Sequence, residues 1–226
     1  CGWKRWLAEL AAEMRSLAQA LPGDRLALGA GYAALYWVMV ESFRPDADGL
    51  VRTESSSSLT QAWWLARQAA GATRACEVGF NAGHSAMAVL LGSEASLVSF
   101  DLLSKSYTPA CADFVGRVFP GRFELVPGPS NETLPRYARR NLAAPPCDFV
   151  YVDGGHAFAE ALDDLLFMSL LAVHGRTLVV VDDVGCEAWY CEGPTLAWEA
   201  FRDAGRVREL GCLAEEHRRW CWGLYM

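Results

Sequence analysis

Apolar residues follow two different patterns along the chain. They recur at helical spacing in residues 3–21, from residue 26 to about residue 43, and in a third run that ends at Gly71. From Thr73 onward, short apolar runs alternate with helical segments, which is typical of a mostly parallel sheet with helices on both faces. We therefore predict an α/β fold that follows several N-terminal helices.

The second pattern predicts seven strands. Five are of the parallel type, and the last two are joined by a tight connection around His217, so they should pair antiparallel. The predicted strands cover residues 75–80, 96–101, 122–127, 147–153, 176–183, 206–216 and 218–226. The predicted helices between them cover residues 84–92, 109–118, 131–141, 157–173 and 194–204.

A polar, serine-rich stretch, RPDADGLVRTESSSS, separates the first helices from the rest of the chain. We expect a loop there, with Ser/Thr residues that cap the next helix. The predicted domain boundary falls at its end. Residues 1–58 would form a helical extension that acts as a lid or as the interface of a homo-oligomer, and residues 59–226 the main domain. The apolar run 26–40 is too short to span a bilayer comfortably, so no membrane span is expected.

Composition narrows the classes of function. Of the 226 residues, 52% are hydrophobic and 21% charged, as in a globular protein. The net charge of −7 offers no basic surface, so a nucleic-acid partner is not expected. The chain begins at Cys1 rather than Met, and we expect that its true N-terminus lies upstream or has been trimmed.

The eight cysteines show no CxxC pair and no Cys/His cluster with zinc spacing, so a structural zinc site is not expected. Cys76 and Cys147 lie in or beside apolar runs and are predicted to be small buried hydrophobic residues. A reduced, cytoplasmic setting is the default expectation. The sequence leaves open a disulfide in two further pairs, Cys186 with Cys191 and Cys212 with Cys221.

The first predicted strand leads into a turn that suits the binding of a small cofactor. Glu77 is followed by Gly79-x-x-x-Gly83 and by a helix that opens at residues 84–85. Glycine permits a close approach of the backbone and unusual dihedral angles. The dinucleotide fingerprint G-x-G-x-x-G requires a second glycine where this chain has Asn81, so a pyrophosphate loop is disfavoured.

The next two strands add candidate cofactor contacts. Asp101 ends the second strand, where a carboxylate can accept hydrogen bonds from the ribose hydroxyls of an adenosine. That role suits an NAD enzyme equally well, and a helix cap is the structural alternative. The third strand leads to Gly128 and Ser130 at the same predicted edge of the sheet.

Three carboxylates follow the fourth and fifth strands. Asp153 ends the fourth, and Asp182 and Asp183 end the fifth. The carboxyl ends of neighbouring strands converge on one crevice, where three carboxylates repel one another unless a cation neutralises them. Oxygen ligands favour Mg²⁺ or a similar ion. The alternative, that each acid only caps a helix, does not account for their shared position. His156 follows Asp153 closely and can accept a hydroxyl proton near neutral pH.

The combination of E-x-G-x-x-x-G, VDGGH and VVVDD resembles the class I S-adenosylmethionine-dependent methyltransferases. Among these it is similar to the metal-dependent O-methyltransferases with a D-G-x-H and D-D site, which act on sugars of macrolide-type and aminocoumarin natural products. The related catechol-type enzymes end their fifth strand in Asp-Asn instead. The resemblance covers roughly residues 55–226.

The resemblance implies a Rossmann-like fold and transfer of a methyl group to a hydroxyl of a sugar or phenolic small molecule. Matched residue by residue, Asp153, Asp182 and Asp183 correspond to ligands of Mg²⁺ or a similar cation. His156 corresponds to the general base, with Asp153 beside it in catalysis. The implied contacts to S-adenosylmethionine are Glu77, Gly79, Asn81, Gly83, His84, Ser85, Asp101, Gly128, Ser130 and Asp153.

Two pairs of residues near these motifs have competing interpretations. Trp189 and Tyr190 follow the fifth strand, where a loop could cover an aromatic or sugar substrate. Asp163 and Asp164 lie on the helix after VDGGH and are predicted to belong to its solvated face.

Three other functions stay open at this point. One is a metal-free methyltransferase with a nitrogen or carboxylate acceptor. Another is a nicotinamide-dependent oxidoreductase, which Asn81 and the lack of a Tyr-x-x-x-Lys pair disfavour. The third is a non-catalytic module that keeps the cofactor, although the full set of carboxylates argues against a degenerate site.

Overall fold

The structure is a computed structural model that describes residues 2–42, 58–141, 143–215 and 217–226. The predicted serine-rich loop lies outside the described residues except for Ser58. This residue is the N-cap of α4 (Leu59–Gln68), and its hydroxyl accepts a hydrogen bond from the backbone N–H of Gln61 at 3.0 Å. The predicted Ser/Thr cap is therefore confirmed.

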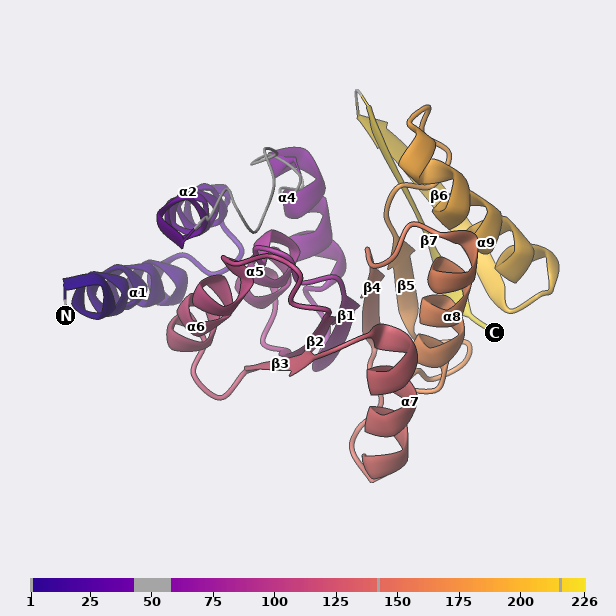
Figure 1. The fold of residues 1–226 in the computed structure, drawn as a ribbon, viewed down its shortest axis with the longest axis horizontal. Coiled ribbons are helices and arrows are strands. Elements are labelled where there is room, and N and C mark those ends of the chain that lie inside the picture. Colours follow the sequence, from indigo (N-terminus) through magenta and orange to yellow (C-terminus); the bar gives the residue numbers. More distant parts are fainter. Residues whose placement is uncertain (1, 43–57, 142, 216) are drawn as a thin grey trace. The chain divides into compact units, whose positions relative to one another are not determined.

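Seven strands form one mixed sheet in the order β3-β2-β1-β4-β5-β7-β6 (Figure 1). Strand β4 pairs in parallel with β1 and β5, whereas β7 is antiparallel to both β5 and β6. This confirms the predicted mostly parallel sheet with a terminal hairpin. The strands are β1 (Arg74–Val78), β2 (Ser96–Asp101), β3 (Phe123–Pro127), β4 (Phe149–Val152), β5 (Leu178–Val181), β6 (Val207–Glu215) and β7 (Arg218–Tyr225).

The strand order reverses between β1 and β4. In open α/β sheets, ligands bind outside the carboxyl ends of the strands at such a reversal. Strands β4 and β5 read FVYV and LVVV, and all of their residues but the first of β5 are buried. Near-continuous apolar runs of this kind are expected of parallel strands that are covered on both faces.

The chain divides into two compact units, and each is described by itself. The first comprises residues 1–73, 80–99 and 103–125. Within it, α1 packs against α2 and α6, and α4 packs against α5. Among the described residues, no helix is both long enough and apolar enough to cross a membrane. The further helices of this unit are α1 (Gly2–Ala20), α2 (Arg25–Ser42), α5 (His84–Gly92) and α6 (Thr108–Val118).

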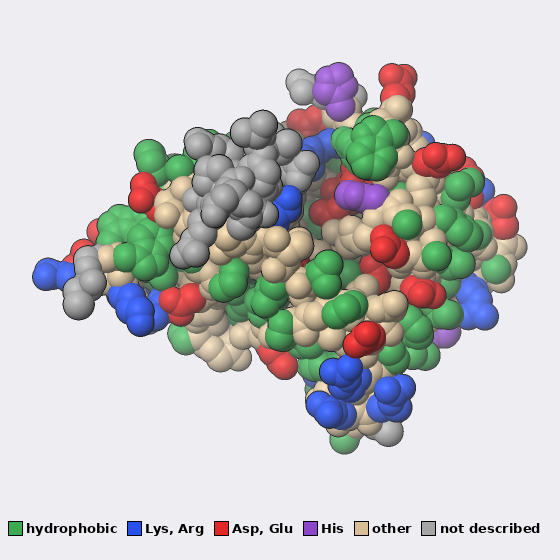
Figure 2. Space-filling model, viewed as in Figure 1, with side chains coloured by type: hydrophobic (Ala, Val, Ile, Leu, Met, Phe, Trp, Pro, Cys, Tyr) green, Lys and Arg blue, Asp and Glu red, His purple; other side chains and the backbone are tan. Residues whose placement is uncertain are grey.

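The second unit comprises residues 74–79, 100–102 and 126–226. Within it, α8 packs against α7 and α9 (Figure 1). Figure 2 shows basic side chains gathered at the end of α7, whose last turn carries Arg139 and Arg140. Cations are stabilised at that end of a helix by its dipole. The helices are α7 (Ser130–Arg140), α8 (Phe158–Ser169), the 3₁₀ helix η1 (Trp189–Cys191) and α9 (Glu192–Asp203).

Helix α8 ends at Ser169, earlier than the predicted end at residue 173. The backbone N–H of Cys147 donates to the carbonyl of Leu171 at 2.7 Å, and Cys147 forms an isolated parallel bridge with Ala172. The residues after Ser169 therefore pair with the segment that enters β4. Backbone groups used in this way are not available to continue a helix.

The cysteines differ from the prediction at one pair. Cys76 and Cys147 are buried as expected, but they form a disulfide instead of acting as separate hydrophobic residues. Disulfides persist mainly in oxidising compartments, so the predicted cytoplasmic setting remains a prediction only. The two pairs that the sequence left open, Cys186 with Cys191 and Cys212 with Cys221, are also disulfides.

The packing of α4 on α5 predicts the effect of a single added methyl group. A Cβ at Gly92 would lie 2.3 Å from the carbonyl oxygen of Ala66 and 2.5 Å from its Cα. Because both atoms belong to the backbone, Gly92→Ala should destabilise the protein by about 1–3 kcal/mol. Urea unfolding measures the change. In the control Gly116→Ala, the added Cβ meets only the Phe123 ring at 3.9 Å, so stability should be unchanged or slightly raised. Equal stability of the two variants would contradict the close packing.

Candidate active site

The turn after β1 lies directly against the turn after β4. The backbone N–H of Asp153 donates to the carbonyl of Val78 at 2.9 Å. Gly79 has φ 91°, and a Cβ there would lie 1.9 Å from the carbonyl oxygen of Asp153. Only glycine fits this conformation and this approach. The predicted cofactor turn and the predicted metal turn are therefore packed backbone to backbone.

Other predicted cofactor residues in the second unit lie at the same edge of the sheet. Glu77 is buried on β1, one residue before its end. The backbone N–H of Gly79 donates to the carbonyl of Phe100 at 2.8 Å, and that of Gly128 donates to the carbonyl of Asp101 at 2.9 Å. Ser130 is the first residue of α7. The ends of β1, β2 and β3 are thus tied together by backbone hydrogen bonds.

The remaining predicted cofactor residues belong to the first unit. Asn81 has a left-handed backbone, with φ 49°, and its Oδ1 accepts a hydrogen bond from the Tyr107 hydroxyl at 2.6 Å. The ring of His84 is buried and lies 4.7 Å from that of Tyr32. Both His84 and Ser85 are therefore core residues at the start of α5. Gly83, with φ 84°, has no room for a Cβ beside the Phe80 ring.

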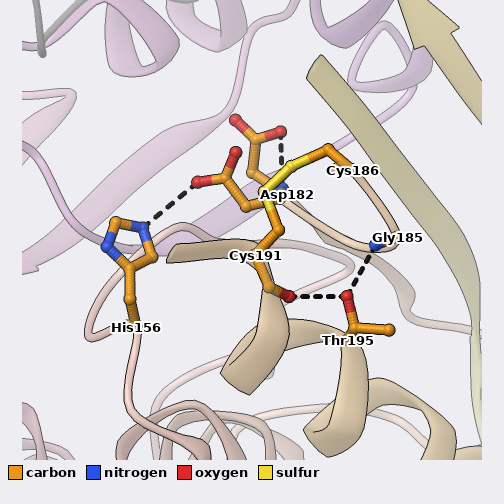
Figure 3. Close-up of a disulfide and its surroundings, with 7 residues drawn as sticks. His156, Asp182, Gly185, Cys186, Cys191 and Thr195 are labelled. Atoms are coloured by element: carbon orange, nitrogen blue, oxygen red, sulfur yellow. Dashed lines mark hydrogen bonds and ion pairs between the residues drawn. A yellow bond between two sulfur atoms is a disulfide. The ribbon is translucent and has the colours of Figure 1, made fainter. Parts of the chain in front are cut away.

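Two carboxylates and an imidazole meet after β4 and β5. His156 Nε2 lies 3.1 Å from Asp183 Oδ2, a contact drawn in Figure 3. One side-chain ligand atom from each of Asp153, His156 and Asp183 lies within 4.8 Å of the other two. The His156 side chain is 43% exposed, so it can be reached from solvent. The structure thus brings together the predicted base and two of the three predicted metal ligands.

Asp182 lies next to this group but has other partners. Its Oδ2 accepts a hydrogen bond from the Tyr151 hydroxyl at 2.9 Å, and its Oδ1 accepts one from the backbone N–H of Asp183 at 3.0 Å. Asp183 has a left-handed backbone, with φ 58°. Asp182 therefore orients its neighbour in this arrangement, and its role as a metal ligand stays a prediction.

Burial and electrostatic repulsion together shift the pKa values of the site. Burial and the nearby Asp182 and Asp183 raise the pKa of Asp153 well above its usual value, and Arg218 opposes this only in part. Burial and the same carboxylates raise the pKa of the Tyr151 hydroxyl, which keeps it a hydrogen-bond donor. The hydrogen bond to Asp183 raises the pKa of His156 against the effect of burial. The site thus holds more negative charge than its own cations balance.

A divalent cation fits this donor set. One carboxylate oxygen of Asp153 and one of Asp183 lie within 4.8 Å of each other, and carboxylate oxygens are the ligands that Mg²⁺ and similar ions prefer. Besides burial, repulsion by Asp182 and Asp183 raises the pKa of Asp153, and a bound cation would relieve that repulsion.

One buried acid of the site differs from the prediction. Asp164 was predicted on a solvated face, but it is 0% exposed, whereas Asp163 is partly exposed. A Cβ at Gly154 would lie 2.4 Å from Asp164 Oδ2, so the carboxylate lies directly under the turn that links Asp153 to His156. Burial raises the pKa of Asp164 to about 6, although the Ser130 hydroxyl and a backbone N–H act in the opposite direction.

The comparisons with known proteins agree with this geometry. Residues 76–184 match a family model described as a methyltransferase domain. No curated protein matches the chain. Among solved structures, the chain is similar to cofactor-bound Rv0187 from MTB, with 18% identity over 86% of this chain and 89% of that one, and a TM-score of 0.70.

Two further structures are O-methyltransferases. TomG from Streptomyces achromogenes, involved in tomaymycin synthesis and solved with S-adenosylmethionine, has 18% identity over 86% of this chain and 89% of its own, and a TM-score of 0.67. CalS11, a TDP-rhamnose 3'-O-methyltransferase of calicheamicin biosynthesis, has 16% identity over 72% and 76%, and a TM-score of 0.55.

The fold and the matched segment define the class of protein. The sheet has the class I methyltransferase fold, and residues 76–184 match the model of a methyltransferase domain. The predicted Rossmann-like class and the predicted kind of enzyme are therefore confirmed.

The buried carboxyl of Asp164 predicts a pH dependence of stability. A carboxyl whose pKa is raised on folding binds more protons in the folded state, so it lowers stability as pH rises through the interval from about 4 to about 6. The loss amounts to roughly 3 kcal/mol, and Asp164→Asn should remove it. Urea unfolding at about pH 4 and about pH 7 measures the difference.

The control for this test is Asp163→Asn, which removes the same charge from a partly exposed neighbour. It should keep the pH dependence of the wild type. If Asp164→Asn and Asp163→Asn depend on pH alike, Asp164 is not a buried, proton-binding group in the folded protein.

Proposed function

We propose that this protein transfers a methyl group from S-adenosylmethionine to a hydroxyl oxygen of a small molecule, with a divalent cation such as Mg²⁺ orienting the acceptor. The observation that carries the proposal is the contact between Gly79 and the carbonyl of Asp153. It joins the turn that resembles a donor-binding loop to the turn that begins the group of Asp153, His156 and Asp183. Donor and acceptor sites of one reaction need this proximity.

The chain's own residues have distinct tasks in this reaction. Asp153 and Asp183 would hold the cation, and Asp182 orients Asp183 through its backbone N–H. His156 Nε2 would accept the acceptor's hydroxyl proton, and the carboxylate of Asp183 stabilises the resulting imidazolium at 3.1 Å. A bound cation would lower the pKa of the acceptor hydroxyl.

Donor binding is assigned to the ends of β1, β2 and β3. Glu77 and Gly79 would lie at the methionine end of the donor. Asp101 would accept hydrogen bonds from its ribose hydroxyls, with Gly128 and Ser130 near the adenine. Solved structures with this fold that contain S-adenosylmethionine or a bound cofactor support the assignment.

The names of two similar proteins support a small-molecule acceptor. CalS11 is named as a TDP-rhamnose 3'-O-methyltransferase, and TomG as an O-methyltransferase involved in tomaymycin synthesis. The acceptor named for CalS11 is a sugar, which is a small molecule. We therefore propose a sugar or phenolic acceptor, and no nucleic acid or protein.

Removal of the cation tests the proposal. Turnover, followed as release of S-adenosylhomocysteine with a panel of phenols and sugars, should be lost in EDTA and restored by excess Mg²⁺. Asp153→Asn should lower kcat/KM by at least about 100-fold, because it removes a charged ligand. The control Glu199→Gln, at an exposed position of α9, should behave as the wild type.

The outcomes separate the two parts of the proposal. Full turnover in EDTA would refute the cation's role and leave a metal-free methyltransferase. Failure of S-adenosylhomocysteine to bind, measured by calorimetry, would refute methyl transfer itself.

We also infer that the N-terminal helices form an interface between two copies of the chain. Large apolar side chains stay exposed on α1 and α2, where Trp3 is 37% and Trp37 57% exposed. Exposed aromatic surface of this kind is typical of association sites. Sedimentation should show a dimer that Trp37→Arg converts to a monomer, while the control Arg5→Ala, at an exposed ion pair, leaves it dimeric. A monomeric wild type would contradict the inference.

A further inference from the structure

The loop between β5 and α9 is closed on itself. Cys186 and Cys191 form a disulfide, with their Cα atoms 5.7 Å apart. Thr195 fastens the loop a second time: its Oγ1 accepts a hydrogen bond from the Gly185 N–H and donates one to the Cys191 carbonyl, each at 2.6 Å (Figure 3). Before the loop, the Val184 N–H donates to the carbonyl of Arg219 on β7 at 2.9 Å. We call residues 185–191 the clamped loop.

The disulfide lies beside the candidate active site. One carboxylate oxygen of Asp183 and the sulfur atoms of Cys186 and Cys191 lie within 4.8 Å of one another. Asp183 in turn contacts His156 Nε2 at 3.1 Å. Figure 3 shows the disulfide on one side of these carboxylates and the imidazole on the other. A change in the clamped loop therefore acts on the surroundings of Asp183, the residue that contacts the proposed base His156.

The clamped loop presents two aromatic rings. Trp189 is 85% exposed, the largest exposed fraction among the large hydrophobic residues of the described chain. The ring of Tyr190 lies 5.9 Å from that of Trp189 at an interplanar angle of 83°, and 5.6 Å from the ring of His156. On the face shown in Figure 2, a bulky hydrophobic side chain stands next to a histidine and acidic groups. The rings thus form a corner next to the proposed base.

An exposed indole on a loop that is closed by a disulfide is suited to stacking. An indole carries a large apolar face that gains free energy when another ring covers it. A loop that is already closed loses less conformational freedom on binding than an open one does. A flat aromatic ring can use both rings of the corner, one through its face and the other through its edge. The arrangement favours an aryl acceptor over a sugar.

We propose that the Cys186–Cys191 disulfide locks the clamped loop as a wall that binds an aromatic acceptor on Trp189 and Tyr190, and that reduction of this disulfide releases the wall. The proposal rests on the function proposed above and names its acceptor as a phenol-type ring. Tyr190 and Trp189 are specificity-determining residues in this scheme, while the disulfide positions them.

The redox step is an exchange with a dithiol. A thiolate of the reductant attacks the sulfur of Cys186, which is partly exposed, and Cys191 leaves as a thiolate and takes up a proton. The second thiol of the reductant then releases Cys186, so that two electrons reduce one disulfide to two thiols and the reductant becomes a cyclic disulfide. Cys76 and Cys147 are buried and out of reach in the folded protein.

The Cys212–Cys221 disulfide provides a matched control. It joins two directly opposed residues of β6 and β7, which are paired along both sides of it. Because the strand ladder fixes these residues without the covalent bond, its removal should not change the clamped loop. Two variants therefore remove one disulfide each by the same pair of substitutions. Cys186→Ser/Cys191→Ser removes it from a loop, and Cys212→Ser/Cys221→Ser removes it from between two paired strands.

The experiment compares oxidised and dithiothreitol-treated protein, with the opened disulfide identified by mass spectrometry of alkylated peptides. For catechol as the acceptor, opening Cys186–Cys191 should raise KM about tenfold, with little change in the affinity for S-adenosylhomocysteine. The Cys186→Ser/Cys191→Ser variant should show the raised KM without dithiothreitol. The Cys212→Ser/Cys221→Ser variant should keep both the low KM and the response to dithiothreitol.

A second measurement does not depend on turnover. Chymotrypsin cleavage after Trp189 or Tyr190 should be at least about tenfold faster in the reduced protein, because cleavage requires an opened loop. Binding of catechol and of methyl glucoside, followed by saturation-transfer NMR, tests the acceptor class. Trp189→Ala should weaken the binding of catechol and leave that of methyl glucoside unchanged.

The results can overturn the inference independently of the proposed function. If cleavage and catechol binding are the same with the disulfide open or closed, the lock is refuted. If Trp189→Ala weakens only the binding of methyl glucoside, the aromatic class is refuted. If S-adenosylhomocysteine does not bind, the proposal of methyl transfer is refuted. The cleavage test still decides in that case whether the disulfide locks the loop.

Discussion

Repulsion among carboxylates is the constraint around which the site is arranged. Asp153, Asp182 and Asp183 come together because the carboxyl ends of β4 and β5 are neighbours. Burial and the two neighbouring carboxylates raise the pKa of Asp153, and Arg218 opposes this only in part. The hydroxyl of Tyr151 donates a hydrogen bond to Asp182, and the imidazole of His156 contacts Asp183. A cation bound as proposed would neutralise the charge that these two contacts leave uncompensated.

The backbone framework makes that crowding stable. The turn after β1 reaches the turn after β4 because Gly79 has no side chain, and Asp164 supports the same turn from below. Such contacts between backbone atoms tolerate no insertion of atoms, so the positions of Asp153 and His156 depend on residues that carry no chemistry.

The alternation of short apolar runs with helical segments was enough to predict most of the fold. Each predicted strand appears in the structure, because buried parallel strands such as β4 and β5 leave continuous apolar runs in the sequence. The end of α8 was missed because it depends on a bridge from Cys147, which lies far away in the chain. The Cys76–Cys147 disulfide was missed for a similar reason. Its formation depends on the register of β1 against β4, and a sequence does not contain the register of parallel strands.

The sequence predicted correctly those site residues whose positions are determined by the end of a strand. It failed for a residue whose position depends on which face of a helix is buried. Asp153, His156 and Asp183 meet because each follows the end of a strand. Asp164 was assigned to the solvated face, although it shares the buried side of α8 with Ala161 and Met168, at spacings of three and four residues. The phase of that apolar stripe was a signal that could have identified it. The partners of Asp182 could not be foreseen, since they depend on side-chain direction.

The left-handed backbone of Asp183 limits what evolution can place at this position. With φ 58°, most side chains are strained there, whereas asparagine, aspartate and glycine are tolerated. Of these, only aspartate and asparagine offer an oxygen to a metal. The residue at this position can therefore be aspartate or asparagine and little else. This matches the Asp-Asp ending of the enzymes that the sequence resembles and the Asp-Asn ending of the related catechol-type enzymes. Diversification of such a site is then expected in the neighbouring loops, where backbone geometry leaves the choice of residue free.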